Sequence, residues 1–347
     1  MKGNLRVYSI EQCTEWDEIV KSFKNYDVYW LSGYVKAFQI HGDGEPVLFF
    51  YEDLNCRGIN AVMKRDISKD KHFVGVVESN IWFDFVTPYG YGGWIIEGEE
   101  NADLFSAYEE WCLDHNIISE FVRYHPVIKN YKDGAMFYDT VSLGGTIAMD
   151  ISSTEAIWSN LKSKNRNMVR KAKRAGVEIY NGRYPQIYEE FRNIYNGTMD
   201  KDDAEPYYYF GTEFYQSLLN DLSTEAQVFY AELNHKVIAT SIILGVNHRL
   251  NYHLSGSLRE YQNLAPTNLL LYQAALWGCA NGYTTFHLGG GVGCREDSLY
   301  KFKKAFYRGE SCCFYIGKKL YAEHKYNELV NMRSDIRDDG FFPLYRG

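Results

Sequence analysis

The chain has 347 residues, 46% of them hydrophobic, and a formal net charge of −8. This length allows two domains of ordinary size, and the acidic balance argues against a protein that coats nucleic acid. No apolar stretch approaches the ~18 residues of a membrane span, and the first residues lack the apolar region of a secretory signal. The seven cysteines are scattered and lack zinc spacing, which indicates reduced thiols in a cytoplasmic protein without a metal site.

The first half of the chain predicts a short series of strands followed by a helix and a further strand. Alternating apolar runs at 45–53 and 58–66 are typical of hairpin strands, and 79–96 reads as a strand that continues into a glycine-rich loop. The helical pattern at 101–116 is followed by a strand-like run at 117–126. The order of strands and helices predicted for the first half is similar to that predicted for the second half, which suggests two similar units.

The second half opens with a basic segment that we predict to be one helix over 150–176. Ser152 or Ser153 can cap its N-terminus, and Gly176 can end it. Apolar residues at helical spacing predict a buried stripe of Ile157, Leu161, Met168, Ala172 and Ala175. Cationic residues line a neighbouring face, namely Lys162, Arg166, Arg170 and Lys173.

The rest of the second half predicts a helix, a meander of three strands, and then alternating helices and strands. The first helix covers 184–199, and the meander occupies 226–233, 236–245 and 249–257. Thr267 is the expected cap of the next helix. The later elements are helix, strand, helix and strand at 265–283, 284–291, 295–306 and 311–321.

These elements predict an α/β (α+β) fold with two tandem domains, each a mixed, mostly antiparallel sheet flanked by helices. We place the domains at 1–145 and 146–317, and expect 318–347 to pack back on the first. In each sheet two neighbouring strands should run parallel and splay apart. The splayed strands would expose backbone N–H and C=O groups that can bind an extended ligand.

Two stretches, "IWSNLKSKNRNMVRKAKRAGV" and "FHLGGGVGCREDSLYKFKKAF", resemble the FemABX-like peptidoglycan-bridge aminoacyltransferases. They also resemble BioF2-like acetyltransferases of the GNAT superfamily. The resemblance implies two tandem GNAT-like domains and transfer of an acyl or aminoacyl group to an amine without a metal. It implies no tightly bound cofactor, with acyl-CoA or aminoacyl-tRNA as co-substrate, and a cell-wall or sugar-nucleotide precursor as acceptor.

The resemblance also implies site residues. The segment "WLSGYVK" resembles one whose lysine contacts substrate phosphate, here Lys36, and Lys201 stands where a phosphate-binding arginine is expected. Lysine keeps the charge but loses the bidentate fork of arginine. Phe302 and Lys303 match a motif near the acyl donor, and Tyr252 matches a tyrosine presented to the cleft. We take Tyr252 and Lys303 as the catalytic candidates.

Glycines and tyrosines add candidates from the residues themselves. Gly289 and Gly290 belong to a run of glycines that ends a strand, which favours close approach of a ligand but also suits a tight turn. Tyr89 and Tyr91 lie in "TPYGYGG", which suits the wall of a substrate cleft or an ordinary aromatic loop. All four are assigned to substrate binding.

No side-chain triad, HExxH motif or P-loop is present. We therefore expect catalysis by positioning and by backbone N–H groups that stabilise an oxyanion. Asp297 could be an acid or only a helix cap, and His287 a base or only a sheet residue.

The donor stays open between acyl-CoA, an acyl group bound to a carrier, and aminoacyl-tRNA. The segment 258–268 lacks the glycine-rich pyrophosphate loop of CoA-dependent enzymes, whereas the acidic charge argues against tRNA. Arg166 and Arg170 are candidates for binding an anionic, phosphate-bearing substrate. The alternative function is a non-catalytic nucleic-acid or anionic-polymer binding module that uses the basic helix 161–176.

Overall fold

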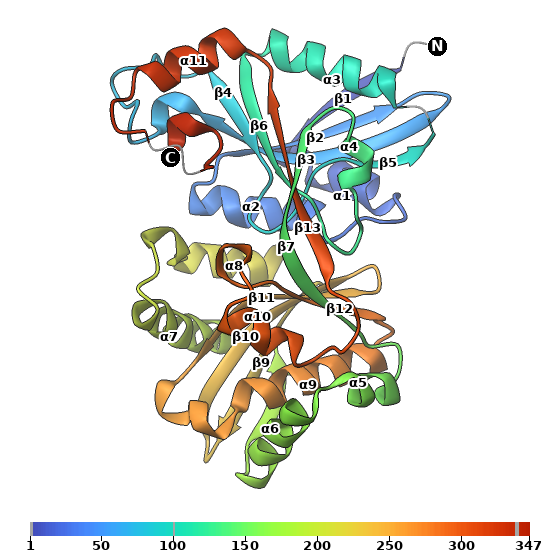
Figure 1. Ribbon diagram of the computed structural model, residues 1–347, viewed down its shortest axis with the longest axis vertical. Coiled ribbons are helices and arrows are strands. Elements are labelled where there is room, and N and C mark those ends of the chain that lie inside the picture. Colours follow the sequence, from blue (N-terminus) through green and yellow to red (C-terminus); the bar gives the residue numbers. More distant parts are fainter. Residues whose placement is uncertain (1–2, 100, 337–339) are drawn as a thin grey trace. The chain divides into compact units, whose positions relative to one another are not determined.

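The computed structural model describes residues 3–99, 101–336 and 340–347. The chain divides into two compact units (Figure 1). Unit 1 comprises Met1–Leu143 and Phe314–Gly347, and unit 2 comprises Gly144–Cys313. We keep the domain boundaries 1–145 and 146–317, with 318–347 packed on the first domain, as a proposal.

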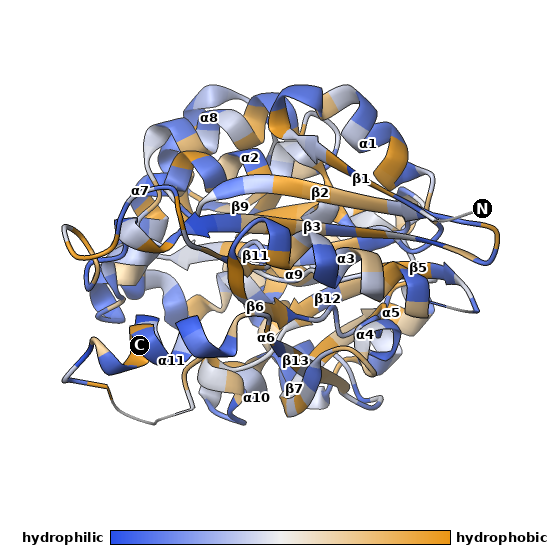
Figure 2. Cartoon of the chain, turned by 90° about the horizontal axis from the view of Figure 1, so that it is seen from above, coloured by the Kyte–Doolittle hydropathy of each residue, from blue (hydrophilic) through white to orange (hydrophobic). Residues whose placement is uncertain are grey.

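Unit 1 contains a mixed sheet in which most neighbouring strands are antiparallel and β4 and β6 are parallel. Strand β5 pairs with β3 off the main order. Figure 2 shows β2 mainly in the hydrophobic colour, in agreement with the burial of six of its eight residues. In sheet order the strands are β1 (Asn4–Ser9), β2 (Glu45–Glu52), β3 (Cys56–Asp66), β4 (Phe83–Val86), β6 (Ile117–Arg123) and β13 (Cys312–Leu320), with β5 (Ile95–Gly98).

Helices cover this sheet, and aromatic side chains fill much of the core between them. Trp94, Phe49 and Tyr108 are fully buried there, with ring centroids 4.8–5.0 Å apart in edge-to-face geometry. The helices are α1 (Cys13–Lys21), α2 (Ser32–His41), α3 (Ala102–Asp114), α4 (Tyr131–Gly134) and α11 (Glu323–Asn331).

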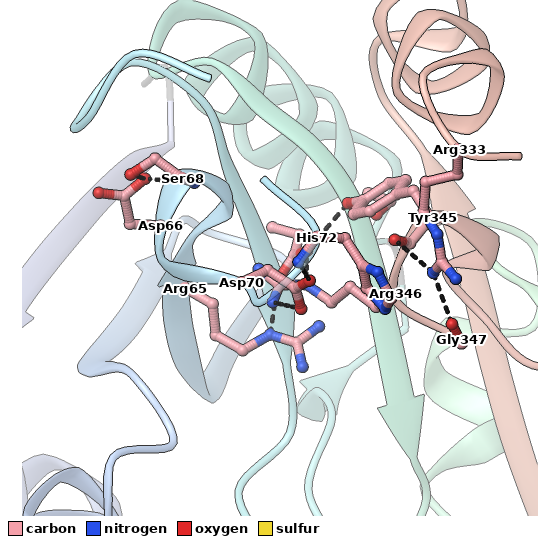
Figure 3. A network of polar contacts seen from close by, with 11 residues as sticks. Arg65, Asp66, Ser68, Asp70, His72, Arg333, Tyr345, Arg346 and Gly347 are labelled. Carbon is pink, nitrogen blue, oxygen red and sulfur yellow. Dashed lines mark hydrogen bonds and ion pairs between the residues drawn. The ribbon is translucent and has the colours of Figure 1, made fainter. Parts of the chain in front are cut away.

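Residues late in the chain complete unit 1 by neutralising a buried carboxylate on β4. Asp84 is fully buried and accepts hydrogen bonds from Arg65 Nε at 2.7 Å, Arg346 Nε at 2.6 Å and the Tyr345 hydroxyl at 2.9 Å. Figure 3 shows how Arg65, Tyr345 and Arg346 converge from separate segments. Burial opposes ionisation, but the two guanidinium groups hold the pKa of Asp84 below its ordinary value.

Unit 2 contains the second mixed, mostly antiparallel sheet. Strands β9, β10 and β11 form the predicted meander, joined by the two-residue turns Asn234-His235 and Asn247-His248. All four turn residues have positive φ, as type I′ hairpin turns require. In sheet order the strands are β7 (Asp139–Asp150), β12 (Thr285–Gly289), β11 (Arg249–Ser257), β10 (Lys236–Val246), β9 (Ala226–Leu233) and β8 (Glu178–Gly182).

The helices of unit 2 pack on its sheet (Figure 1). Helix α9 contributes Leu270, Leu271 and Ala274 to a fully buried cluster with Ile243 of β10. Helix α7 lies so close to β11 that a Cβ on Gly256 would stand 2.8 Å from an α7 carbonyl oxygen. The helices are α5 (Thr154–Asn160), α6 (Ser163–Arg174), α7 (Pro185–Lys201), α8 (Thr212–Asp221), α9 (Pro266–Ala280) and α10 (Ser298–Lys304).

The prediction of one helix over 150–176 was wrong, because the chain forms α5 and α6 with a break between them. Leu161 and Lys162 have extended backbones, and the Lys162 N–H donates to the carbonyl of Ala305 at 2.9 Å. Ser153 caps α5, as one of the two predicted alternatives. The periodicity of the sequence runs through the break, so the sequence pattern alone does not reveal it.

Two further local predictions were corrected. Val169 is buried with Leu161 and Ala172, whereas Met168 and Ala175 are only half-buried, because α6 begins anew at Ser163 and the stripe rotates. Thr267 lies inside α9 and does not cap it. The cap is Ala265 in a left-handed conformation (φ 59°), followed by Pro266 in the first turn.

The predicted fold class is confirmed: each unit is a mixed, mostly antiparallel sheet flanked by helices. Among the described residues, no helix is both long enough and apolar enough to cross a membrane.

Candidate functional site

The parallel pair β11–β12 separates after three residues. Its ladder joins Arg249 to Thr285 and ends with Asn251 opposite His287, although β11 continues to Ser257. Both strands lie entirely within the residues that the structure describes. Beyond Asn251, β11 stays paired with β10 along one edge, and its pairing with β12 along the other edge has ended. The predicted splay is therefore present in unit 2, and backbone groups of β11 at this point are released from the β12 ladder.

Both splayed strands carry an irregularity at the point where they separate. In β11, His253 is the extra residue of a bulge against β10. In β12, Leu288 occupies the same position in the pairing with β7. Bulges bend strands and redirect side chains, and they are frequent beside active sites.

Lys303 of α10 reaches the end of β12 at this place. Its Nζ donates to the carbonyl oxygen of Gly290 at 2.7 Å, and the residue is only 8% exposed. Burial lowers the pKa of Lys303 to about 8, and the negative charge of Asp297 partly opposes that shift. Lys303 therefore loses its proton more readily than an exposed lysine does.

The glycines at the end of β12 make room for this lysine and for neighbouring backbone. Gly289 has φ 79°, and a Cβ there would lie 3.3 Å from the Lys303 Nζ. A Cβ on Gly290 would lie 2.9 Å from the carbonyl oxygen of Gly145. Gly289 is thus required by its left-handed backbone, and Gly290 by the close packing of the backbone around it.

Tyr252 lies on β11, one residue beyond the end of the ladder with β12. The Lys303 Nζ is 5.8 Å from the centroid of the Tyr252 ring, within cation–π range. Burial raises the pKa of Tyr252, while hydrogen bonds with Ser255 and Ser241 lower it. The structure therefore brings together Tyr252, Lys303, Gly289 and Gly290. Phe302 adjoins them on α10 but packs toward the core, edge-on to Phe306 at 5.4 Å.

Asp297 and His287 have structural partners near this site. Asp297 caps α10, accepting from the Tyr300 N–H at 2.8 Å and the Val292 N–H at 3.0 Å. His287 is buried in β12, with Nε2 3.0 Å from the Thr146 hydroxyl. These contacts support the interpretation of Asp297 as a cap and His287 as a sheet residue.

In unit 1, the predicted substrate residues Lys36, Tyr89 and Tyr91 are all half-buried. Lys36 lies on α2, on the same helix as Phe38, whose ring stacks on that of Tyr89 at 5.5 Å. Tyr34, also on α2, donates its hydroxyl hydrogen to the Tyr89 carbonyl at 2.5 Å. Helix α2 and the loop between β4 and β5 therefore form one packed surface.

Buried polar residues that sequence reasoning missed fix this loop. Asn130 is 2% exposed and donates to the carbonyls of Gly92 and Trp94 at 2.9 and 3.0 Å. His125 is fully buried, lies 3.5 Å from the Asp27 carboxylate, and contacts the Tyr91 ring at 5.1 Å between centroids. These pairs form no sequence motif, because their members are far apart along the chain.

The remaining cationic candidates lie elsewhere. Lys201 ends α7, and its ammonium lies 3.2 Å from the carboxylate of its neighbour Asp202. Arg166 is hydrogen-bonded to Ser163 at 3.3 Å on α6. The Arg170 guanidinium lies over the Trp158 ring at 5.2 Å.

Within the described parts of the chain, no group of three or more His, Cys, Asp or Glu side chains is placed to hold a metal ion. All seven cysteines are free thiols.

Residues 159–304 match the family described as the acetyltransferase (GNAT) domain. The matched stretch lies within unit 2. This stretch includes the splayed strands β11 and β12, Tyr252 and Lys303. The chain is accordingly an acyltransferase, as the sequence predicted. Among curated proteins, none matches the chain.

Solved structures extend the likeness of the GNAT domain to nearly the whole chain. FemX superposes with a TM-score of 0.66 at 11% identity, over 94% of this chain and 99% of FemX. The C-terminal domain of a putative lysylphosphatidylglycerol synthetase from Agrobacterium fabrum gives 0.56 at 13% identity, over 94% and 98%. A protein of unknown function from Bacteroides thetaiotaomicron gives 0.59 at 12% identity, over 91% and 100%. The predicted resemblance to FemABX-like members of the GNAT superfamily is confirmed at the level of the fold.

Proposed function

We propose that the chain is an N-acyltransferase whose GNAT domain holds an activated acyl donor between β11 and β12. The acyl group would pass to an amine of a cell-envelope or sugar-nucleotide precursor in the cytoplasm. The observation that carries this proposal is the end of the parallel ladder at Asn251 and His287, with the Lys303 ammonium beside it.

The chemistry needs a neutral amine, a carbonyl made electrophilic, and a group that stabilises the oxyanion. The amine attacks the acyl carbon, the tetrahedral oxyanion forms, and the thiol or hydroxyl of the donor leaves with a proton. Lys303 would donate a hydrogen bond to the oxyanion together with backbone N–H groups of β11. Because Lys303 is buried, its charge acts in a medium of low dielectric, where it is more effective than in water. GNAT domains take the acyl donor as a co-substrate, so no resident cofactor is needed.

Roles in acceptor binding are proposed for half-buried residues of unit 1 and, separately, for the cation that ends α7 in unit 2. Tyr89 and Tyr91 would offer aromatic faces, and Lys36 and Lys201 would contact phosphate. The resemblance to FemABX-like proteins supports a phosphate-bearing envelope precursor. Phe302, Gly289 and Gly290 would line the donor end of the site.

The proposed donor is acyl-CoA, a carrier-bound acyl group or an aminoacyl-tRNA. The N-terminus of α9, where a glycine-rich pyrophosphate loop is absent, begins with Ala265 in a left-handed conformation and then Pro266, which has no N–H to offer an anion. Helix α6 offers cations instead. Arg170, Lys171 and Arg174, with Asn167, line a surface hollow. We assign Arg166 and Arg170 to binding of the anionic donor.

The direct test is a panel of acyl-CoA and aminoacyl-tRNA donors assayed with envelope-precursor amines. Lys303→Met should lower kcat by about 10²–10³-fold, the range for loss of one oxyanion donor. Lys301→Met is the matched control, because Lys301 lies on the same helix but is exposed. The proposal fails if the folded wild-type protein uses no donor, or if both variants retain full activity.

Salt dependence then distinguishes the donors. Arg166→Ala with Arg170→Ala should raise KM for the donor, by an amount that shrinks as salt rises. With tRNA, log K should fall steeply with log salt, because phosphate contacts release counterions.

A non-catalytic module that binds nucleic acid or another anionic polymer is the second candidate. It is favoured by the seven Lys and Arg residues within 162–174, a stretch with no acid. RNA binding that survives Tyr252→Phe and Lys303→Met, without any acyl transfer, would support this candidate over the enzyme.

A further inference from the structure

The loop that joins β12 to α10 carries the carbonyl group that Lys303 binds. This carbonyl belongs to Gly290, and it accepts from the Lys303 Nζ at 2.7 Å. The loop turns sharply further on, where Gly293 and Cys294 have left-handed backbones with φ 57° and 62°. A left-handed backbone is unfavourable for a residue with a side chain, such as Cys294, and it persists only where neighbouring contacts hold it.

Asp297 holds this loop and the helix with the two oxygens of a single carboxylate. Its Oδ2 accepts from the Val292 N–H in the loop at 3.0 Å, and its Oδ1 accepts from the Tyr300 N–H in the first turn of α10 at 2.8 Å. The carboxylate lies so close to the loop that a Cβ on Gly291 would overlap it. One side chain therefore bridges the loop and the helix.

The two ends of this bridge lie close in sequence to the two partners of the Lys303 hydrogen bond. Val292 follows Gly290 after one intervening residue, and Tyr300 lies about one helical turn before Lys303. Tyr300 is itself held in place, because it is buried and its hydroxyl oxygen lies 2.8 Å from that of Ser311. A shift of the loop relative to α10 would therefore change the distance between the Lys303 Nζ and the Gly290 carbonyl.

We propose that Asp297 is a positioning residue for Lys303: its carboxylate ties the loop after β12 to α10 and thereby sets where the ammonium group lies in the acyl-transfer site. This inference rests on the proposed acyl transfer, in which Lys303 donates to the oxyanion. It goes beyond the capping of α10, because a cap needs only one of the two carboxylate oxygens. An error of about 1 Å in the place of a group that binds the transition state can lower a rate about 10²-fold.

Two substitutions of Asp297 separate the bridge from the cap and from the charge. Asp297→Asn keeps a good helix cap, but its amide has one oxygen, so it can serve only one of the two N–H groups that now bind separate oxygens. Asp297→Glu keeps the charge, but the added methylene moves the carboxylate away from both donors. Each substitution should lower kcat about 10- to 100-fold. KM for the donor should change little, because Lys303 acts on the oxyanion and not on the bound ground state.

A second background and a second cap serve as controls. Neither substitution should change the residual rate of Lys303→Met, because Asp297 acts through the ammonium that this variant lacks. Ser153→Ala reports the loss of a cap alone, since the Ser153 hydroxyl oxygen accepts from the Ala156 N–H at 3.1 Å at the start of α5. It should lower the free energy of unfolding and leave kcat unchanged.

The outcomes separate this inference from the proposed function. If Asp297→Asn retains full kcat, the cap alone is enough, and the positioning role is overturned while acyl transfer stands. If Asp297→Glu retains full kcat, the charge alone is enough, and the inference is overturned as well. If either substitution slows Lys303→Met as much as it slows wild type, Asp297 acts only through the fold, which also overturns the inference.

A measurement without substrate covers the case in which no transfer is found. The ¹⁵Nζ resonance of the Lys303 ammonium, assigned with Lys303→Met, should shift in Asp297→Asn and in Asp297→Glu and stay in place in Ser153→Ala. An unchanged resonance in both Asp297 variants would overturn the inference whatever the activity assays give.

Discussion

The buried ammonium of Lys303 should make the stability of the protein depend on pH in a way that methionine abolishes. Burial lowers the pKa of Lys303 from 10.5 to about 8 in the folded protein. Below pH 8 the group is charged in both the folded and unfolded states, and its burial lowers the free energy of unfolding. As pH rises from 8 toward 10.5, the folded protein releases the proton first, so this cost disappears.

The size of the effect follows from the shift. A change of pKa from 10.5 to about 8 corresponds to about 3 kcal/mol in total. Between about pH 7 and pH 9.5, wild type should gain about 2 kcal/mol in unfolding free energy relative to Lys303→Met. At pH 7 itself the variant also loses the hydrogen bond to the Gly290 carbonyl, so the change with pH is the informative quantity.

Urea denaturation of wild type and Lys303→Met at both pH values measures this change. Groups other than Lys303 titrate alike in the two proteins and cancel in the difference. Lys301→Met should show no such trend, because Lys301 is exposed on the same helix. A wild-type-minus-variant difference that stays constant between the two pH values would refute the assignment of a buried, charged lysine.

Three further predictions concern other positions. Gly290→Ala places a methyl group 2.9 Å from a backbone oxygen and should lower unfolding free energy by about 1–3 kcal/mol, measured by urea denaturation. Asn130→Ala leaves two buried carbonyls without their donor. It should lower the free energy of unfolding by about 2–4 kcal/mol and speed hydrogen exchange in the loop after β4. Burial raises the pKa of Asp133 to about 6, so its ionisation lowers stability progressively from about pH 4 to pH 6, and the loss is complete above pH 6. Asp133→Asn should then be stabilising by up to about 3 kcal/mol at pH 7, and this gain should vanish by about pH 4 in the same assay.

The strands of unit 2 could be predicted from sequence because their signals are local. The dipeptides Asn234-His235 and Asn247-His248 lie between apolar runs, and each forms a turn with positive φ at both residues. The break between α5 and α6 could not be predicted in this way. It depends on a hydrogen bond from Lys162 to Ala305, more than a hundred residues away.

In the candidate site, too, local features could be predicted from sequence and long-range contacts could not. Lys303 and Tyr252 could be named from their motifs, but the burial of Lys303 and its contact with the Gly290 carbonyl arise only when α10 meets the end of β12. The bulge at His253, the residue after Tyr252, was not predicted, because no local sequence pattern indicates it.

The order of segments in unit 1 has a consequence for how the protein is made. Unit 2 is continuous in sequence, whereas unit 1 needs Phe314–Gly347 to be complete. During synthesis, the strands before residue 143 emerge long before the partner of Asp84, Arg346, exists. Until then Asp84 has only Arg65 for charge compensation, and its full desolvation is unfavourable. We therefore expect unit 2 to become protease-resistant on the ribosome first, and unit 1 only after Phe314–Gly347 has emerged.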